Sequence, residues 1–191
     1  MLFGRLIGEL GATHLFQPHR DQVSGNLGGE WASPGVPEPA TDKFKLITHK
    51  KPEAGDREVV LQINLTAQIP GAELGPAIHD GDRWLLPAME ITVDQCSHRV
   101  MSHVKDAELF GICLDKALRL IQDEWRLETV HLIVIAPTTA CFRTGQKMQA
   151  RHHADFLLYE RVPGGGGFAP TIRISPTEVR MQSTGTSVSI S

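Results

Sequence analysis

Uncharged polar side chains follow two apolar stretches of the chain, and these side chains suit ligand binding. Thr66 and Gln68 come directly after one apolar run. Thr138 and Thr139 come shortly after another. Hydroxyl and amide groups of this kind bind bases and riboses, or they simply cap helices. Their shared position after an apolar run favours ligand binding over capping alone.

Two basic residues, Arg143 and Lys147, lie four positions apart behind the second pair of threonines. Residues with this spacing share one face of a helix, so the two cations could approach a single phosphate. Lys and Arg are also common on exposed helix faces, where they only contact water. The sequence favours neither interpretation over the other.

Cysteine and histidine side chains are weaker candidates for chemistry. Cys141 lies near the start of a predicted helix, where a helix N-terminus could lower the pKa of a thiol, but the neighbouring Ala140 favours a small packed side chain. His14, His19 and the pair at 152–153 could bind a metal if they were brought together, but no third ligand follows at zinc-site spacing. We therefore predict no catalytic residue and no metal site.

Four consecutive glycines at residues 164–167 invite comparison with a phosphate-binding loop. Such a loop needs its glycines between a strand and a helix, usually with a following Lys and Ser or Thr. Here strand-like stretches lie on both sides. We therefore predict a flexible hairpin connection.

One strand–turn–helix–strand unit positions most of the candidate groups. Residues 130–135 form an apolar run rich in β-branched residues, which predicts a strand buried on both faces of a mostly parallel sheet. The turn follows at Ala136 and Pro137, where Pro cannot donate to strand pairing and a Thr can cap the next helix. That helix is predicted over 140–151 and the next strand over 154–159. Ligands of open α/β sheets lie outside the carboxyl ends of the strands, which places a ligand at this turn.

The other stretches predict an α/β fold in which helices flank a mostly parallel sheet and a β-hairpin ends the chain. Asp106 is the predicted N-cap of the longest helix. The further predicted elements are strands at 43–48, 58–65 and 84–93 with an edge extension at 99–103, helices at 72–79 and 106–125, and hairpin strands at 171–174 and 178–181.

The first 42 residues differ in composition from the rest of the chain. They combine a predicted short helix at 2–10 with a Pro- and Gly-rich loop at 17–41. We expect residues 43–191 to form the main domain, with 1–42 as an appendage or as part of the same domain.

Global composition narrows the classes of function. The chain has 191 residues and a formal net charge of −3 at pH 7, so no bulk charge drives it toward duplex nucleic acid. Its three cysteines lack CxxC spacing and fit a reducing compartment, which predicts a cytoplasmic protein. Arg5 and Glu9 interrupt the N-terminal segment MLFGRLIGEL, so neither a signal peptide nor a membrane span is predicted.

The stretch VHLIVIAPTTACFRTGQKM, followed by HADFLLYER, resembles the signature of SAVED domains, and the resemblance covers residues 57–185. Cys141 departs from the family pattern, which usually has a small aliphatic residue there, and Gln146 stands where a basic residue is common. The second departure shifts the expected phosphate contact from the charges of the helix to the backbone of the preceding turn. The matching residues are His131, Leu132, Ala136, Pro137, Ala140, Gly145 and Tyr159.

This resemblance implies a Rossmann-like, CARF-like fold and a sensor function. SAVED domains are similar to CARF domains and recognise cyclic oligonucleotides in CBASS anti-phage immunity or type III CRISPR signalling, generally as fusions to an effector. The implied ligand is a cyclic oligonucleotide of the oligoadenylate type, for example a trinucleotide, with no other cofactor. Its binding would drive self-association or activate an effector domain or partner protein.

The implied ligand would lie across the carboxyl ends of the strands that end at Leu65 and Ile135. Backbone N–H groups that follow these strands would meet phosphates, and side chains would contact sugars or bases. The residues that this resemblance and the sheet geometry assign to the ligand are Thr66, Gln68, Ala136, Pro137, Thr138, Thr139, Arg143 and Lys147.

Two alternatives stay open at this point. The chain could be a ring nuclease that cleaves such a messenger, for which His103 and Lys147 are the candidate residues. It could also be an adaptor domain whose sheet only mediates protein contacts. Intact ligand after long incubation would dismiss the nuclease, and a ligand-dependent thermal shift would dismiss the adaptor.

Overall fold

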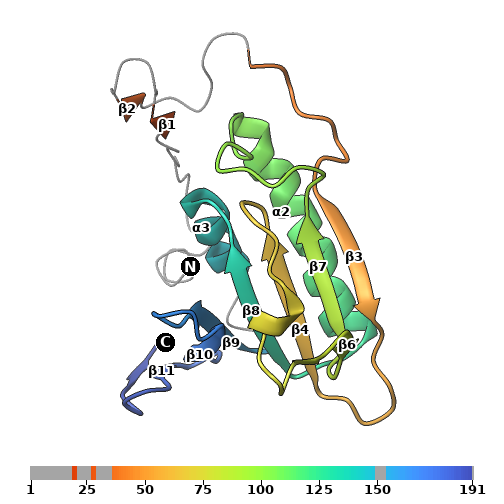
Figure 1. Ribbon diagram of the computed structural model, residues 1–191, viewed down its shortest axis with the longest axis vertical. Coiled ribbons are helices and arrows are strands. Elements are labelled where there is room, and N and C mark those ends of the chain that lie inside the picture. The colour runs from red at the N-terminus through yellow and green to blue at the C-terminus, as the bar shows by residue number, and fades with distance from the viewer. Residues whose placement is uncertain (1–18, 21–26, 29–35, 149–153, 191) are drawn as a thin grey trace.

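An eight-stranded mixed sheet forms the core of the chain (Figure 1). The computed structural model describes residues 19–20, 27–28, 36–148 and 154–190. The strands of the sheet are β3 (Lys45–Lys50), β4 (Glu58–Asn64), β7 (Ala88–Thr92), β8 (Thr129–Ile135), β9 (Asp155–Arg161), β10 (Phe168–Ile174), β11 (Glu178–Met181) and β12 (Ser187–Ser189). Their order across the sheet is β12-β11-β10-β9-β8-β4-β7-β3.

The four central strands of this sheet are parallel. β4 pairs in parallel with both β7 and β8, and β8 pairs in parallel with β9. β3 borders one side in antiparallel pairing, and β10, β11 and β12 extend the other side in the same way. β4 and β8 are buried along most of their length, as expected for strands covered on both faces. The predicted α/β fold with a parallel sheet and a C-terminal β-hairpin is confirmed.

Among the described residues, two helices cover one face of the sheet (Figure 1). α2 spans Val104–Arg119 and continues as a π-helical turn at Leu120–Glu124, and α3 spans Thr138–Lys147. α2 connects β7 to β8 and α3 connects β8 to β9, so both helices begin beyond the carboxyl ends of parallel strands. In the part of the chain that the structure describes, no helix has the length and apolarity needed to span a membrane.

The start of α2 corrects the prediction that Asp106 is its N-cap. The N-cap is His103, whose Nδ1 accepts a hydrogen bond from the N–H of Lys105 at 3.1 Å. Asp106 lies three positions later, and its carboxylate accepts from the backbone N–H groups of Ser102 and His103. This reciprocal arrangement is a capping box, so the chain itself satisfies the N-terminus of α2.

An irregular connection covers the opposite face of the sheet. It contains a 3-10 turn, η1 (Gly71–Glu73), and a small hairpin of β5 (His79–Asp80) and β6 (Arg83–Trp84). The prediction of a helix at 72–79 is therefore wrong. The turn folds back on the hairpin so closely that a Cβ at Gly71 would lie 2.4 Å from the ring of His79, and further Pro and Gly residues interrupt helical hydrogen bonding here.

Several predicted boundaries also differ from the structure. The stretch 84–93 holds two strands, β6 and β7, with Pro87 between them, and residues 99–103 form no strand. Two short strands, β1 (His19–Arg20) and β2 (Leu27–Gly28), pair within the predicted N-terminal loop. The glycine run at 164–167 connects β9 to β10, so the predicted hairpin connection is confirmed. The predicted helix at 2–10, His14 and residues 149–153 lie outside the described residues.

Candidate functional site

The carboxyl ends of β4, β7 and β8 meet at one boundary of the sheet, which we call the carboxyl edge (residues 65–68, 93–100 and 136–139). The N–H groups of Leu65 and Thr66 both donate to the carbonyl of Ile135, at 2.9 and 3.1 Å. The N–H of Ser97 donates to the carbonyl of Leu65 at 3.0 Å. The structure therefore brings the predicted site residue Thr66 next to the turn that begins at Ala136.

The N-terminus of α3 opens onto this edge without a side-chain cap. Its N-cap is Pro137, and within the described chain no side chain accepts a hydrogen bond at this position. The prediction that a Thr caps the helix is wrong, because Thr138 and Thr139 already belong to the first turn. Thr138 is exposed and Thr139 is 3% exposed. Among the described residues, the N-terminus of α3 thus has no side-chain cap, in contrast with that of α2.

Gln68 lies at the carboxyl edge but turns toward β7. Its Nε2 donates to Thr92 Oγ1 at 2.9 Å and to Cys96 Sγ at 3.4 Å, and its Oε1 accepts from Asn64 Nδ2 at 3.4 Å. The side chain therefore ties the end of β4 to the end of β7. A ligand at this edge would meet a Gln68 that already has protein partners.

Beneath Gln68, a buried polar network links three strands on the face opposite the helices. Asn64 Nδ2 donates to one Glu90 oxygen at 3.0 Å, and His49 Nε2 lies 2.9 Å from the other. Asn64 is 1% and Glu90 7% exposed. The hydrogen bond from His49 holds the pKa of Glu90 below its ordinary value, with a further contribution from Asn64. A weak sign of this network is visible in the sequence, where Gln62 and Asn64 are polar residues at alternate positions of the apolar run EVVLQIN.

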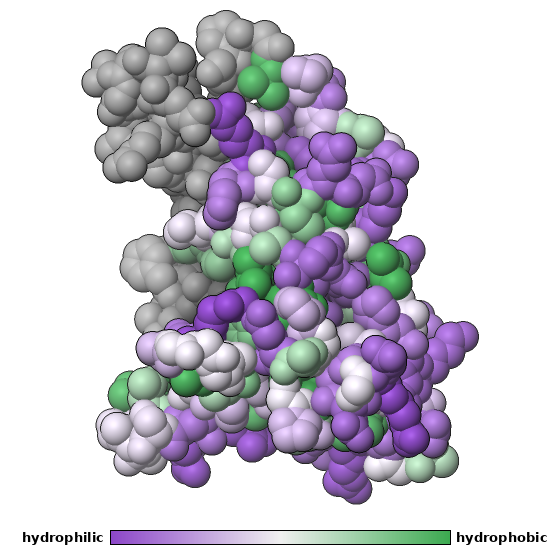
Figure 2. Space-filling model, in the orientation of Figure 1, coloured by the Kyte–Doolittle hydropathy of each residue, from purple (hydrophilic) through white to green (hydrophobic). Residues whose placement is uncertain are grey.

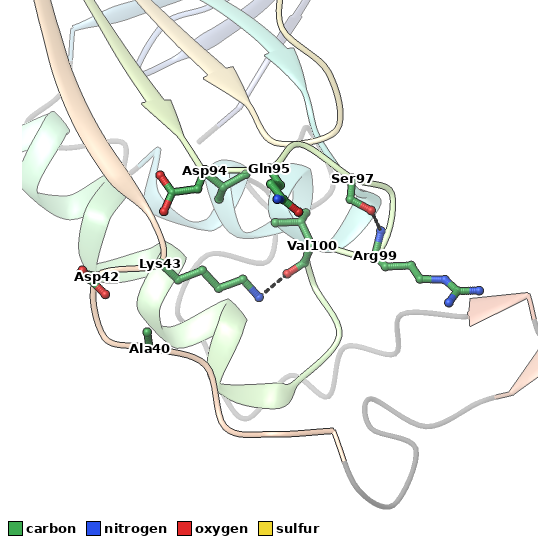
Figure 3. Close-up of a pocket in the computed structure, with 9 residues that line it drawn as sticks. Ala40, Asp42, Lys43, Asp94, Gln95, Ser97, Arg99 and Val100 are labelled. Carbon is green, nitrogen blue, oxygen red and sulfur yellow. Dashed lines mark hydrogen bonds between the residues drawn. The ribbon is translucent and has the colours of Figure 1, made fainter.

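A pocket of about 450 Å³ opens at the carboxyl end of β7, beside the start of β3 (Figure 3). Lys43 enters it and donates to the carbonyl of Val100 at 2.7 Å and to Asp106 at 2.6 Å. Asp94 forms an ion pair with Lys45 on β3. Charges of both signs and apolar side chains share the walls, which suits a ligand group with both polar and apolar surface. The lining residues are Ala40, Asp42, Lys43, Val93, Asp94, Gln95, Ser97, Arg99 and Val100.

Arg143 and Lys147 face α2 and lie along α3, beyond its first turn. Lys147 Nζ lies 2.9 Å from a carboxylate oxygen of Asp115. Arg143 Nη1 donates to Gln146 Oε1 at 3.0 Å, and a Cβ at Gly111 of α2 would lie 3.9 Å from Arg143 Nε. The predicted shared face exists, but it packs against a neighbouring helix.

Two further candidates have local structural roles. Cys141 Sγ lies 3.7 Å from the carbonyl of Ala136, and burial raises the pKa of this thiol, which agrees with a small packed side chain and not with a reactive thiolate. His103, a candidate of the nuclease alternative, caps α2. Among the described residues no group of three or more His, Cys, Asp or Glu could hold a metal ion.

The comparisons with known proteins concern the family and the fold of the chain. No curated protein matches the chain. The Acinetobacter baumannii Cap4 SAVED/CARF-domain containing receptor has a similar fold, with 21% identity and a TM-score of 0.51 over 69% of this chain and 26% of the receptor. The same receptor with the cyclic trinucleotide 2'3'3'-cAAA gives 18% identity and a TM-score of 0.54 over 78% of this chain and 30% of the receptor. The receptor with 3'3'3'-cAAA gives 20% identity and a TM-score of 0.52 over 68% of this chain and 27% of the receptor.

The chain thus spans less than a third of the length of the receptors that share its fold. The family model of the SMODS-associated and fused to various effectors sensor domain matches residues 1–174. This match covers most of the 191 residues and includes the whole carboxyl edge. The chain belongs to the SAVED family of sensor domains.

Proposed function

We propose that the chain is a sensor module that binds a cyclic oligonucleotide, of the oligoadenylate type, at its carboxyl edge. The observation that carries this proposal is the contrast between the two helices that begin there. α2 closes its N-terminus with its own capping box, whereas α3 begins after Pro137, beside Thr66, with no side-chain cap among the described residues. An uncapped helix N-terminus between the ends of two parallel strands favours a phosphate.

The size of the edge suits a ligand with several nucleotides. A phosphate at the N-terminus of α3 would lie two strand spacings, about 10 Å, from the pocket at the end of β7. That pocket then receives a base or sugar, with Gln95 and Ser97 as hydrogen-bonding partners. Thr66, Thr138 and Gln68 lie along the path between the two ends. The Acinetobacter baumannii Cap4 receptor, which has this fold, is solved with two different cyclic trinucleotides, which supports a ligand of this class.

In this proposal, the remaining predicted residues either shape the site or act on the ligand at longer range. Ala136 and Pro137 shape the turn, and Thr139 stays buried beneath it. Arg143 and Lys147 act at longer range, because the Lys147 ammonium pairs with Asp115. Binding favours self-association or an effector contact, and the module performs no chemistry of its own. We place the protein in the cytoplasm, where such messengers are made.

Replacing Thr138 by Pro tests the phosphate contact directly. Thr138 is the first residue of α3, a position that Pro tolerates, and Pro137 already has the extended backbone that a following Pro requires. The substitution removes one N–H from the site and leaves the helix intact. We expect affinity for the cyclic trinucleotides 2'3'3'-cAAA and 3'3'3'-cAAA to fall about tenfold or more, since a hydrogen bond to a charged group contributes ~1.5–3 kcal/mol. Isothermal titration measures the loss.

Val104→Pro is the matched control, because Val104 is the first residue of the capped helix α2 and is 59% exposed. Its affinity should stay within about twofold of the unchanged chain. Thr138→Val separates the hydroxyl from the N–H. Equal affinity in all three variants would remove α3 from the site, and no binding of any cyclic di-, tri- or tetranucleotide would refute the sensor proposal. Recovery of intact ligand after long incubation is expected, whereas linear products would favour the nuclease.

A further inference from the structure

The last three strands, β10 to β12, carry an apolar face outward from the core. Residues paired across neighbouring strands share a face, and on this face Ile172 pairs with Met181 and Val179 pairs with Val188. Ile172 and Val179 still pack against the core cluster, whereas Met181 is 40% and Val188 63% exposed. Figure 2 shows apolar surface among pale, weakly polar side chains at the lower left, where these strands lie. The apolar face therefore continues past the region that the helices cover.

The other face of the same strands is polar. Arg173 pairs with Asp155 across β9 and β10, at 2.6 Å, and Arg180 pairs with Glu178 within β11, at 3.2 Å. The two serines of β12 continue this face to the end of the sheet. The three strands thus have one solvated face and one face suited to a covering partner.

β12 is a lateral edge of the sheet, and its outward backbone groups have no strand to pair with in the described chain. The N–H of Ile190 donates to the carbonyl of Thr177 on the β11 side. Antiparallel pairing alternates, so the N–H and C=O of Val188 also point toward β11. The corresponding groups of Ser187 and Ser189 point away from it. Each copy therefore offers two donors and two acceptors along a bare edge.

The opposite lateral edge, β3, is protected in the ways that natural sheets use against edge-to-edge pairing. Lys45 on β3 forms an ion pair with Asp94, and Lys50 donates to the carbonyl of Leu85 at 2.8 Å. The pairing of β3 with β7 also shifts register between Thr48 and Lys50. β12 reads Ser-Val-Ser and has neither a charge nor a Pro nor a bulge.

We propose that β12 pairs antiparallel with β12 of a second copy of this chain, about a two-fold axis at Val188. In this register Ser187 of each copy lies opposite Ser189 of the other, and their outward N–H and C=O groups pair. Val188 lies opposite its own counterpart in the non-hydrogen-bonded position, where side chains approach most closely. One continuous sheet then runs through both copies.

A second copy fits this edge because the strand is complementary to itself. The antiparallel arrangement sets serine against serine on the polar face and valine against valine on the apolar face. No like charges meet, because β12 carries none. A symmetric contact of this kind uses the same patch on both copies and closes as a dimer without growing further. The contact is independent of the proposed ligand site, so the dimer forms without a cyclic oligonucleotide.

Val188→Lys tests the interface by placing two ammonium groups opposite each other. Light scattering after gel filtration, at loading concentrations from about 1 to 500 μM, should show a concentration-dependent dimer of the unchanged chain. The dissociation constant of the variant should rise at least about tenfold, because like charges directly opposite destabilise strand pairing. Ile47→Lys is the matched control, since Ile47 is also an exposed apolar residue, 41% exposed, on the other lateral edge. Circular dichroism checks that both variants keep the fold.

Val188→Cys gives a second readout that does not depend on affinity. Under mild oxidation this variant should form a covalent dimer, because the two-fold axis places the new thiol against its own copy at a separation that a disulfide can bridge. Met181→Cys, one strand further in, should not. The unchanged chain under the same oxidant controls for its three native cysteines.

Three outcomes would overturn this proposal. One is a monomer at every concentration, the second is a dimer that Val188→Lys leaves unchanged, and the third is equal cross-linking of Val188→Cys and Met181→Cys. None of them affects the ligand proposal, which is measured by titration at the carboxyl edge. A monomer that captures a strand from a different protein would likewise refute self-pairing.

Discussion

The signature residues His131 and Tyr159 contact each other and not the carboxyl edge. His131 Nδ1 lies 2.8 Å from the Tyr159 hydroxyl, and His131 Nε2 lies 2.8 Å from Glu58 Oε2. Burial, and next the charge of Glu58, raise the pKa of Tyr159, so its hydroxyl keeps its proton in this hydrogen bond. His131 precedes Ile135 by four strand residues, about 13 Å. These two signature residues therefore contribute to the fold of the sheet and do not line the carboxyl edge.

Tyr159→Phe should therefore weaken the fold and leave ligand binding unchanged. The variant removes a hydrogen-bond partner of a histidine that is 8% exposed, and an unpaired buried polar group costs about 1–3 kcal/mol of unfolding free energy. Urea unfolding measures this loss. The double variant with His131→Phe should cost less than the sum of the two single changes, since both remove the same contact. A large loss of ligand affinity with normal stability would instead place the pair at the binding site.

At the scale of elements, the glycine run at 164–167 anchors the β9–β10 hairpin to η1. Gly167 has φ +75°, and a Cβ there would lie 2.6 Å from the carbonyl oxygen of Glu73. Arg161 reinforces the contact through an ion pair with Glu73. The run that resembles a phosphate loop thus closes the face of the sheet opposite the helices.

Gly167→Ala and Gly165→Ala should separate backbone conformation from this contact. Both glycines have positive φ, at +75° and +90°, so each substitution should cost about 1 kcal/mol of stability. A Cβ at Gly165 meets nothing within 4 Å, whereas at Gly167 it meets backbone. We expect Gly167→Ala to lose at least ~1 kcal/mol more than Gly165→Ala in urea unfolding. Equal losses would show that the hairpin moves freely relative to η1.

The elements that could be predicted are those whose conformation is determined by the residues of their own stretch of sequence. The runs at 58–65 and 130–135 identify β4 and β8, because strands buried on both faces need continuous apolar sequence. The turn after β8 follows from Pro137. By contrast, a helix was predicted at 72–79, where contact with the neighbouring hairpin decides the conformation instead. His103 was missed as a cap because histidine is an uncommon N-cap.

For the candidate site, the sequence predicts the backbone arrangement that the structure shows, and the binding roles of its residues stay predictions. Thr66 and the turn at 136–139 were placed together because the carboxyl ends of parallel strands share one boundary. The pocket was missed, since its walls come from residues 40–43 and 93–100 and meet only because β3 lies beside β7. The partners of Arg143 and Lys147 lie on α2, and no spacing within α3 indicates them.

For the whole molecule, the two proposed contacts occupy different boundaries of one sheet. The carboxyl edge lies at the ends of β4, β7 and β8, whereas β12 lies four strand spacings, about 19 Å, to the side of β8. Thr138→Pro should therefore lower ligand affinity and leave the dimer intact. Val188→Lys should do the reverse, with its ligand dissociation constant within about twofold of the unchanged chain.

Because the carboxyl edge and β12 lie apart, we expect little coupling between ligand binding and dimerisation. Coupling is reciprocal, so any effect of the ligand on dimerisation must equal the effect of dimerisation on ligand affinity. The sheet is paired strand to strand from β8 to β12, with one register shift between Pro170 and Ile172, and the structure shows a single arrangement of it. We therefore expect saturating cyclic trinucleotide to leave the dimer dissociation constant within about twofold, and ligand-driven association to use the carboxyl edge itself. Light scattering of both variants, with and without ligand, checks this. A tenfold shift in either constant would correspond to about 1.4 kcal/mol of coupling and would make β12 part of the sensing mechanism.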